Sequence, residues 1–403
     1  MAKLLLIGNH RPSFAVARAL HREGHEIWAG SNEYSDYFEL SNAVRGHLPL
    51  PDFDREAECI AVIEAHLRDH GFDALWPVTD RATRMVAKHR VRLVRHARIV
   101  SPPPGLIKTC VSKTAMATLC AELNVPVAPQ TPVASREQIR KAGRSLGYPL
   151  VIKPTGEGEF IFGHKVITLK AESDLDSLFP EWPDNHVHLL VQQRLNGLRH
   201  NHYFVARDGV LLRGAAIEIL RTDREDGSGY AVEGISSAPR ADLAEQTAKL
   251  VHALGYTGIG CAQYMTSEDS QATSFLEINP RLGANIAAAE ITGADLVGQA
   301  FRLAFGKDVE VLADPWSAAR TGLRYAWSKG DLSGLAWRYR QGAGIEQTLW
   351  DLGRLISSGV KADTHLVFDW HDPLPALACW AHPLIKRFSP EMRPSPGTSI
   401  KAR

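Results

Sequence analysis

The segment at residues 275–281, a strand with two polar side chains that is followed by proline and arginine, constrains the fold of this chain more than any other feature. Its sequence, Phe-Leu-Glu-Ile-Asn-Pro-Arg, predicts a strand that stops at Pro280, because proline has no N–H to donate to a neighbouring strand. A second predicted strand at residues 260–265 precedes it, and the polar residues 267–270 between the two favour a turn. We therefore expect the two strands to form a β-hairpin.

Oxygen-bearing side chains gather on one face of this predicted hairpin. Glu277 and Asn279 are two residues apart, so both point to the same face of their strand. If the turn is centred near Ser270, Gln263 lies opposite Glu277 on that face. Such an incomplete set of oxygen ligands suits Mg²⁺ held jointly with phosphates, and the guanidinium of nearby Arg281 suits an anionic phosphoryl group. The alternative is an ordinary edge hairpin whose Glu277 and Asn279 face water.

Two lysines stand at the ends of other predicted elements. Lys153 lies near the end of an apolar strand predicted over residues 149–154, where a buried ammonium is costly unless an anion binds it. The alternative is a lysine whose ammonium reaches water along the strand edge. Lys113 lies near the start of a helix predicted over residues 112–123, with Ser112 as its cap.

The order of these residues along the chain resembles that of the ATP-grasp superfamily. The matching positions are Lys113, Lys153, Gln192, Gln193, Gln263, Glu277, Asn279 and Arg281. The choice of Gln, Glu and Asn on the hairpin is most similar to the synthetase units of the large chain of carbamoyl-phosphate synthetase. The resemblance covers roughly residues 102–306 well, the N-terminal region moderately and the C-terminal region poorly.

The resemblance implies that the chain binds ATP together with two Mg²⁺ ions, which Mn²⁺ could replace. The metal ligands would be Gln263, Glu277 and Asn279. Lys113 and Lys153 would contact the α- and β-phosphates, and Arg281 would contact the γ-phosphate. Arg281 and Lys153 would therefore act in catalysis.

The resemblance also implies a hinge that receives the adenine. Its residues would be Gln192, Gln193 and Leu195. Relatives commonly carry a carboxylate at the position of Gln193 and often a second one near His200, and both acids are absent here. Contacts of Gln193 and His200 with the ribose would then lack charge assistance.

The glycine-rich segment 155–165 falls where the family has its flexible lid. Glycines let backbone N–H groups approach phosphate oxygens, but Glu157 and Glu159 place negative charge beside a polyanion. Phe160 and Phe162 could instead seal a closed cleft against water. A plain loop between strands is the alternative.

The N-terminal residues predict a Rossmann-like domain over residues 1–100. Strands at residues 4–7 and 26–29 enclose a helix at about 13–22, which favours a parallel sheet. The glycine pattern of dinucleotide sites is incomplete, so no dinucleotide is assigned. A further strand over residues 74–80 ends in polar residues at the edge of the sheet where ligands usually bind. The candidates for the substrate site are Asn9, Ser13, Thr79 and Asp80, with turns and helix caps as the alternative.

A long charged segment, residues 221–234, is either a functional or a solvated loop. It corresponds to the segment that shapes the acceptor site in relatives. Arg221 and Arg224 are therefore candidates for binding a substrate carboxylate.

The domain organisation follows from composition. Consecutive prolines at residues 102–104 mark a boundary, so we expect an ATP-grasp domain of two lobes at residues 101–307, with a lid subdomain at about 113–190. The fold class is α/β and α+β multidomain, with a small α+β domain at residues 308–403 whose tail is disordered.

Six tryptophans gather in this C-terminal domain: Trp316, Trp327, Trp337, Trp350, Trp370 and Trp380. They favour a small core or a homodimer contact. A weaker alternative is membrane contact through the basic residues Arg338, Arg340, Lys386 and Arg387.

Charge and hydropathy exclude other classes of protein. A net charge of +1 over 403 residues offers no basic excess for nucleic acid. No apolar run approaches the ~20 residues of a transmembrane helix, and the apolar start is too short for a signal peptide. Five scattered cysteines without a C-x-x-C motif predict reduced thiols in a cytoplasmic protein, with a catalytic cysteine as the alternative.

The resemblance predicts an ATP-dependent carboxylate–amine ligase. A small-molecule carboxylate would attack the γ-phosphorus to form an acyl phosphate, and an amine would then displace phosphate to form an amide or peptide bond. The alternatives are a ligase that uses a thiol or bicarbonate, and a non-catalytic regulator that binds nucleotide. Substrate identity lies beyond the sequence.

Overall fold

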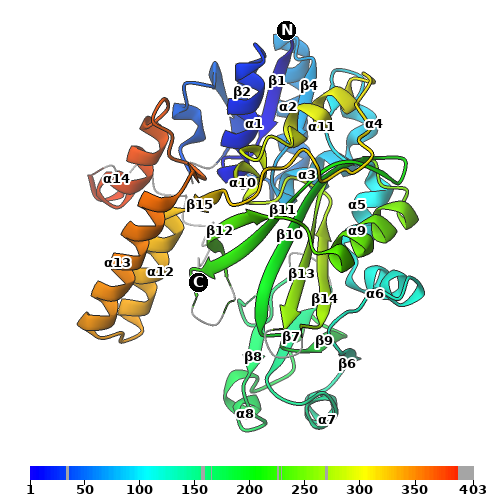
Figure 1. The fold of residues 1–403 in the computed structure, drawn as a ribbon, viewed down its shortest axis with the longest axis vertical. Coiled ribbons are helices and arrows are strands. Elements are labelled where there is room, and N and C mark those ends of the chain that lie inside the picture. Colours follow the sequence, from blue (N-terminus) through cyan, green and yellow to red (C-terminus); the bar gives the residue numbers. More distant parts are fainter. Residues whose placement is uncertain are drawn as a thin grey trace. The chain divides into compact units, whose positions relative to one another are not determined.

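The computed structural model describes residues 1–32, 36–155, 159–164, 166–224, 227, 229–267 and 271–388, with side chains described up to residue 381. These residues belong to two compact units (Figure 1). Unit 1 contains residues 1–107, 199–263 and 278–388, and the described part of unit 2 contains residues 108–198 and 264–277. The domain boundaries predicted at residues 100 and 307 cut the chain differently and stay predictions.

Unit 1 begins with a parallel sheet in the order β3-β2-β1-β4-β5. Its strands are β1 (Lys3–Ile7), β2 (Glu26–Ser31), β3 (Gly46–Pro49), β4 (Ala74–Pro77) and β5 (Arg98–Ile99). The helices of this region are α1 (Arg11–Arg22), η1 (Phe38–Leu40), α2 (Glu56–His70), α3 (Asp80–Lys88) and α4 (Arg90–Leu93). Residues 4–7 are fully buried, which is typical of a parallel strand covered on both faces. The predicted strand–helix–strand order of residues 4–29 is confirmed.

A larger, mainly antiparallel sheet has the order β14-β13-β10-β11-β12-β15-β16. Its strands are β10 (Gly197–Arg207), β11 (Val210–Thr222), β12 (Ala231–Ser237), β13 (Gly258–Ser267), β14 (Thr273–Asn279), β15 (Arg324–Ala326) and β16 (Thr364–His365). The helices that accompany it are α9 (Ala241–Ala253), α10 (Ile286–Glu290) and α11 (Leu296–Ala304). The predicted hairpin is confirmed, because β13 and β14 are consecutive strands and neighbours in the sheet.

Unit 2 contains an antiparallel sheet in the order β6-β9-β7-β8. Its strands are β6 (Gln130–Val133), β7 (Leu150–Pro154), β8 (Ile167–Leu169) and β9 (Leu189–Gln193). The helices in or entering this unit are α5 (Pro104–Val111), α6 (Lys113–Glu122), α7 (Arg136–Leu146) and α8 (Asp174–Leu178). Ile139, Ile152, Phe179 and Val191 belong to its separate apolar core. The alternating apolar residues of β7 turn Ile152 into that core and leave Lys153 at its edge.

Two local features separate or begin helices in this chain. The apolar residues 287–305 alone would favour one long helix, but the structure has two helices, α10 and α11, because Gly293 and Asp295 adopt left-handed backbone angles between them. The prolines at residues 102–104 do not exclude helix, since Pro104 is the first residue of α5, where the missing N–H costs little.

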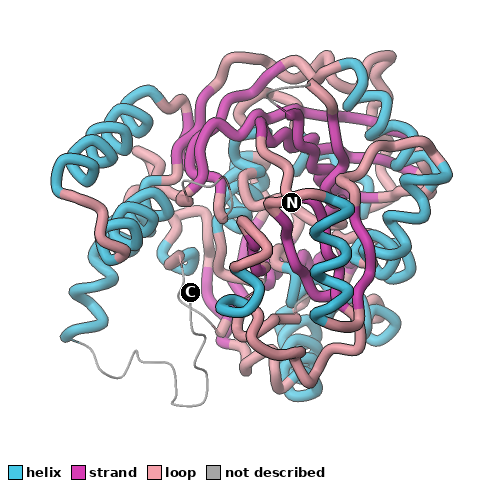
Figure 2. Tube along the Cα trace, turned by 90° about the horizontal axis from the view of Figure 1, so that it is seen from below, coloured by secondary structure: helices cyan, strands magenta, loops and turns pink. Residues whose placement is uncertain are grey.

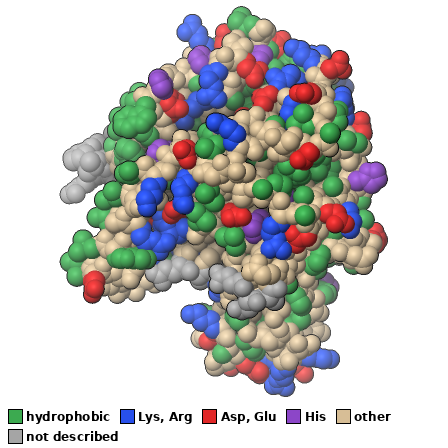
Figure 3. All heavy atoms as spheres, in the orientation of Figure 1, with side chains coloured by type: hydrophobic (Ala, Val, Ile, Leu, Met, Phe, Trp, Pro, Cys, Tyr) green, Lys and Arg blue, Asp and Glu red, His purple; other side chains and the backbone are tan. Residues whose placement is uncertain are grey.

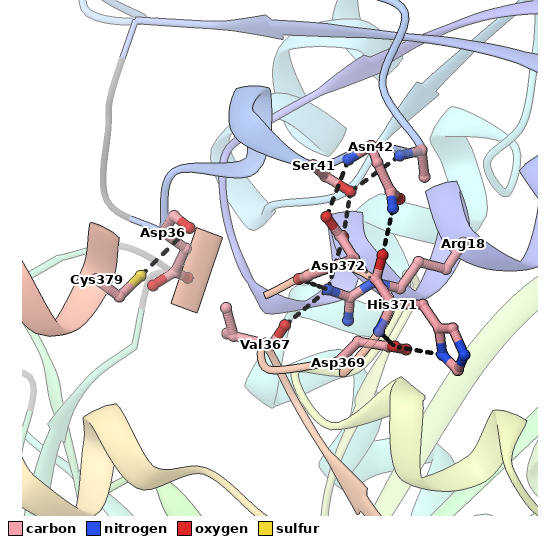
Figure 4. A network of polar contacts seen from close by, with 10 residues as sticks. Arg18, Asp36, Ser41, Asn42, Val367, Asp369, His371, Asp372 and Cys379 are labelled. Carbon is pink, nitrogen blue, oxygen red and sulfur yellow. Dashed lines mark hydrogen bonds and ion pairs between the residues drawn. The ribbon is translucent and has the colours of Figure 1, made fainter. Parts of the chain in front are cut away.

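The C-terminal region is tied to the N-terminal part of unit 1. It contains α12 (Ser328–Arg340), α13 (Ile345–Lys361) and α14 (Leu374–Phe388), and its strand β15 pairs with β12. Asp372, which is buried, accepts hydrogen bonds from Arg18 Nη2 at 2.8 Å, Ser41 Oγ at 2.6 Å and the Asn42 N–H at 2.9 Å (Figure 4). A charged side chain with this many partners fixes the loop before α14 in place.

Candidate active site

Lys153 is the most unusual charge in unit 2. Its ammonium donates to Gln192 Oε1 at 2.6 Å, which is the one hydrogen bond of this group within the described part of the chain. Burial lowers the pKa of Lys153, Glu277 opposes that shift, and Lys113 adds to it by repulsion. Two lysines and one glutamate from distant parts of the sequence are therefore close enough to influence one another. A partly desolvated ammonium with a neutral partner is suited to an anionic ligand.

Lys113 is held at the start of α6. Ser112 caps this helix, because its Oγ accepts from the Ala115 N–H at 3.2 Å, and the Lys113 ammonium donates to the Pro154 carbonyl. Pro154 is the residue after Lys153 and the last of β7. The cap and this contact bring the two lysines to the same end of β7, where the chain enters the predicted lid segment at residue 155.

The predicted adenine hinge lies at the end of β9. Gln193 is the last residue of that strand, and its N–H donates to the Pro129 carbonyl at 2.8 Å. Gln192 bridges the sheet, accepting from Lys153 and donating through Nε2 to Gln130 Oε1 at 3.2 Å. Leu195 follows in a partly buried loop. The hinge residue Gln192 thus joins Lys153 and Gln130 in one side-chain network.

The predicted metal ligands lie on two neighbouring strands. Gln263 belongs to β13, and Glu277 and Asn279 belong to β14. Glu277 is exposed, whereas Gln263 and Asn279 are partly buried. The described residues contain no group of three or more His, Cys, Asp or Glu side chains that could hold a metal ion by themselves. One carboxylate and two amide oxygens fit Mg²⁺ only when phosphate oxygens complete the shell.

Arg281 forms an ion pair within unit 1 that the sequence did not predict. Its Nε and Nη2 both donate to the carboxylate of Asp80, at 2.8 Å for Nη2, and Nη1 donates to the Leu282 carbonyl. Asp80 is the first residue of α3, and Thr79 caps that helix by accepting from the Ala82 N–H. Thr79 therefore has the capping role foreseen as its alternative, and Asp80 orients Arg281.

Sequence comparison identifies relatives of the central region. The family described as the carbamoyl-phosphate synthase L chain, ATP binding domain, matches residues 112–312. The mitochondrial arginine-specific large chain of carbamoyl phosphate synthase from Schizosaccharomyces pombe is 24% identical over 225 residues, which is 52% of this chain and 18% of that relative. The biotin-dependent acyl-coenzyme A carboxylase alpha3 subunit of Mycobacterium leprae is 27% identical over 229 residues, 54% of this chain and 38% of that relative. The chain thus matches well under half the length of either relative.

Solved structures share the fold over most of the chain. Biotin carboxylase from Campylobacter jejuni matches with a TM-score of 0.62 and 16% identity, over 80% of this chain and 74% of that chain. L-amino acid ligase from Bacillus licheniformis matches with a TM-score of 0.62 and 16% identity, over 80% and 78%. The chain belongs to the ATP-grasp superfamily. Since this ATP-grasp fold carries several chemistries, the activity has to be inferred from the site.

The loop assigned to the ATP-grasp acceptor site is partly wrong. Arg221 lies within β11, and its guanidinium binds the carboxylates of Asp331 and Glu233 instead of projecting from a loop. Arg224 stacks on the ring of Trp337 at 3.8 Å, with its Nη1 buried. These contacts give Arg221 a structural role, because two acids of the same chain, one of them the buried Asp331, already neutralise its charge. Binding of substrate by either arginine stays a prediction.

An acid from the neighbouring strand lies beside His200. Glu218 on β11 lies directly opposite His200 on β10, and its Oε1 is 4.0 Å from His200 Nδ1. Burial lowers the pKa of His200, so the ring is neutral near pH 7. Cross-strand register supplies this carboxylate from 18 residues downstream, which no local motif could indicate.

The lid is described over residues 159–164, and Glu157 and Lys165 lie outside the described residues. Glu159 is 3.4 Å from His186 Nδ1, and Phe162 packs on Phe179 with ring centres 5.3 Å apart. Phe162 is 41% exposed, so it covers the apolar core of unit 2 and still presents one face to solvent.

The cysteines do not support the alternative of cysteine catalysis. All five are free and buried. Burial raises the pKa of Cys110 to about 12 and that of Cys59 to about 11, so these thiols stay protonated and unreactive.

The predicted membrane contact through Arg338 is wrong, because this side chain is 8% exposed and binds Asp351. No helix among the described residues has the length and apolar character of a membrane span. A cytoplasmic location stays a prediction.

Arg11 is a candidate that sequence reasoning missed. It is 7% exposed, and its guanidinium lies 3.6 Å from the ring of Trp327 and 5.4 Å from that of Tyr230. Nη1 donates to Asn285 Oδ1 at 3.4 Å, and no carboxylate hydrogen-bonds to Arg11 among the described residues. Arg11 follows β1 at the same sheet edge that suggested Asn9 and Ser13. Those two have internal partners instead: Asn9 binds Glu39 and the Phe38 N–H, and Ser13 binds the Gly8 carbonyl.

Proposed function

We propose that this ATP-grasp chain is an ATP-dependent carboxylate–amine ligase that releases ADP and phosphate. The observation that carries the proposal is Lys153, an ammonium partly removed from water whose hydrogen-bond partner is the neutral amide of Gln192. A triphosphate supplies the negative charge that this group lacks. The charge of Glu277 alone cannot hold a divalent ion tightly, so metal would bind together with nucleotide.

The residues of the chain would act by position and charge. Lys113 and Lys153 hold the α- and β-phosphates, and the Gln192–Leu195 segment receives the adenine. Gln263, Glu277 and Asn279 hold Mg²⁺, which when bound neutralises the triphosphate. Arg281, oriented by Asp80, faces charge that develops on the transferred phosphoryl group.

Group transfer then takes two balanced steps. A substrate carboxylate oxygen attacks the γ-phosphorus, the bond from the γ-phosphorus to the bridging oxygen breaks, and ADP leaves. An amine nitrogen next attacks the acyl carbon, phosphate leaves, and the nitrogen loses a proton to solvent. No side chain forms a covalent bond, so orientation of substrates carries most of the rate enhancement.

Arg11 is the proposed anchor for an anionic substrate. A buried guanidinium stabilised by the faces of Trp327 and Tyr230 keeps its donors available for a carboxylate. Burial lowers the pKa of Arg11, and the charge of Asp36 partly opposes this shift. We therefore expect one of the two substrates to be an amino acid or another small acid with a carboxylate that does not react.

The second candidate replaces the organic acid by bicarbonate. Its support is that carboxylases and carbamoyl phosphate synthases are among the relatives and structural neighbours. The two candidates differ in which acid stimulates release of phosphate from ATP.

The test is mass spectrometry of reactions that contain purified protein, ATP, Mg²⁺, an acid library and an amine library. Ligation predicts a product with the mass of acid plus amine minus water, and phosphate release that requires both substrates. Phosphate release stimulated by bicarbonate without an added organic acid would favour the second candidate. Tight ATP binding without phosphate release in any mixture would favour the non-catalytic regulator.

A further inference from the structure

Helix α13 (Ile345–Lys361) is packed with its polar side inward. Asp351 and Ser358 are each 8% exposed, and they bind Arg338 and Arg221 respectively. The solvent-facing side carries five large apolar side chains that are between 39% and 81% exposed: Ile345, Leu349, Leu352, Ile356 and Val360. A surface helix normally shows the opposite arrangement. We call these five residues the apolar stripe, and such a stripe is typical of a surface that binds another molecule.

The five side chains form one continuous band. Steps of four and three residues keep them within an arc of about 80° on a helix that turns about 100° per residue. The adjacent helix α12 adds Leu332 at 46% and Tyr339 at 62% exposure. Figures 1 and 2 show α12 and α13 as neighbouring helices, and Figure 3 shows hydrophobic side chains on the surface of this region.

Four of the five side chains of the apolar stripe form two pairs when α13 is read from either end, and the fifth, Leu352, corresponds to Gly353. About a centre between Leu352 and Gly353, Ile345 corresponds to Val360 and Leu349 to Ile356. In an antiparallel two-fold pair centred there, these four apolar side chains of one helix lie opposite apolar side chains of the other. Gly353 at the centre has open space where a Cβ would be, which lets a second helix approach closely.

The charges at the two ends of α13 favour an antiparallel partner. Glu346 lies in the first turn and Lys361 is the last residue. An antiparallel second copy places Glu346 of each helix near Lys361 of the other, whereas a parallel copy would place like charges side by side. The polar positions of α13 are not predominantly basic, since Glu346 and Asp351 balance Arg354 and Lys361. That balance gives little attraction to an anionic lipid surface.

We propose that the apolar stripe of α13 binds a second copy of this chain, with the two α13 helices antiparallel about a two-fold axis. Helix α13 is about 25 Å long at a rise of 1.5 Å per residue. A stable interface needs about 800 Å² from each partner, so the exposed side chains of α12 must contribute at the edges. An interface of this small size is consistent with association at micromolar concentrations of the chain. The proposal is independent of the enzymatic reaction.

Sedimentation velocity of the full chain, from about 1 to about 100 µM, measures this association. We expect a monomer–dimer equilibrium that Leu349→Lys weakens about 100-fold, because a two-fold interface receives the buried charge twice. Ile356→Lys has the same effect, since Ile356 is the counterpart of Leu349. The matched control is Gln347→Lys, which adds the same charge on the far side of the helix, next to the carboxylate of Asp351, and leaves the dimer intact. Circular dichroism verifies that all variants fold.

A symmetric crosslink tests the direction of the helices. Cysteine at Leu352 lies beside the two-fold axis, so Leu352→Cys forms a disulfide between two copies under mild oxidation. Ile345→Cys does not, because two copies of residue 345 lie about 22 Å apart in an antiparallel pair. The native cysteines are buried and provide a low background.

Three results would overturn the proposal. The first is a chain that stays monomeric over the whole concentration range. The second is a dimer that Leu349→Lys and Ile356→Lys leave unchanged. The third is a monomer that sediments with vesicles of phosphatidylcholine and phosphatidylserine unless Leu349 is replaced, which would assign the apolar stripe to a lipid surface.

Discussion

Buried positive charges have different partners in two regions of the molecule: a neutral amide at β7 and carboxylates beside α12. In unit 2, Lys153 hydrogen-bonds to a neutral amide and its pKa is lowered by burial. Beside α12, Arg338 binds Asp351 at 2.8 Å, and Arg221 binds Asp331 and Glu233. The first arrangement leaves a charge for a ligand to neutralise, and the second uses the charge to hold the fold together. Sequence alone ranked Arg221 with Lys153 as a ligand-binding candidate, and the partners of each side chain separate the two roles.

The largest expected effect on turnover comes from the predicted metal ligands Gln263, Glu277 and Asn279. Glu277→Ala removes the one carboxylate among the three predicted metal ligands, so we expect turnover to fall about 1000-fold with little change in stability. Phosphate release at saturating ATP and Mg²⁺ measures this loss. Glu159→Ala is the matched control, because Glu159 is a lid carboxylate that contacts His186. Normal turnover in Glu277→Ala would remove Glu277 from the site.

Beside α12 we expect a loss of stability with no change in ATP binding. Asp351→Ala leaves the Arg338 guanidinium buried without its acid, which should lower the free energy of unfolding by about 3–5 kcal/mol. Affinity for ATP should be unchanged in the molecules that remain folded. Urea unfolding and a nucleotide titration measure the two quantities. A variant of normal stability that fails to bind ATP would contradict the division into structural and ligand-binding charges.

Lys153→Met should affect binding rather than stability. Because a desolvated phosphate contact is lost, we expect the affinity for ATP to fall about 100-fold, or by about 2.7 kcal/mol of binding free energy. The free protein should be as stable as the parent or more so, because an incompletely compensated charge is removed. Lys141→Met, an exposed lysine on α7, is the control that should change neither quantity.

The lowered pKa of Lys153 gives a pH test with a defined sign. Phosphates favour the charged ammonium, so ATP affinity is constant below the free-protein pKa and falls by up to about tenfold per pH unit above it. Between that pKa and the ordinary lysine value, the unfolded chain binds more protons than the folded chain. The lysine therefore makes free-protein stability rise with pH in the same range. A decline in ATP affinity that persists unchanged in Lys153→Met would come from another group.

The smallest expected effect is at the start of α3. Thr79→Ala removes the cap that accepts from the Ala82 N–H, so we expect a loss of about 1 kcal/mol of stability. The KM values for substrates should stay within about twofold, because Thr79 acts on the helix. Thr79→Ser preserves the hydroxyl and is the matched control. A large rise in a substrate KM with unchanged stability would restore Thr79 as a substrate ligand.

The parts that could be predicted from sequence depend on local order. The hairpin predicted from residues 260–265 and 275–281 follows from its polar turn and from Pro280, and the strand of Lys153 follows from its apolar neighbours. The remaining features depend on pairings between distant segments. Arg221 meets Asp331 across 110 positions of the chain, and Glu218 reaches His200 through strand register. Arg11 was missed because its burial against the rings of Trp327 and Tyr230 is a property of the folded interior.

Calorimetric titration of ATP with Mg²⁺ into the parent chain, Lys153→Met and Lys141→Met is the most direct measurement of the lysine site. If Lys153 holds the triphosphate, the parent and Lys141→Met bind one ATP per chain with equal affinity, and Lys153→Met binds about 100-fold more weakly. Equal affinity in all three proteins would show that the buried ammonium of Lys153 is not part of a nucleotide site.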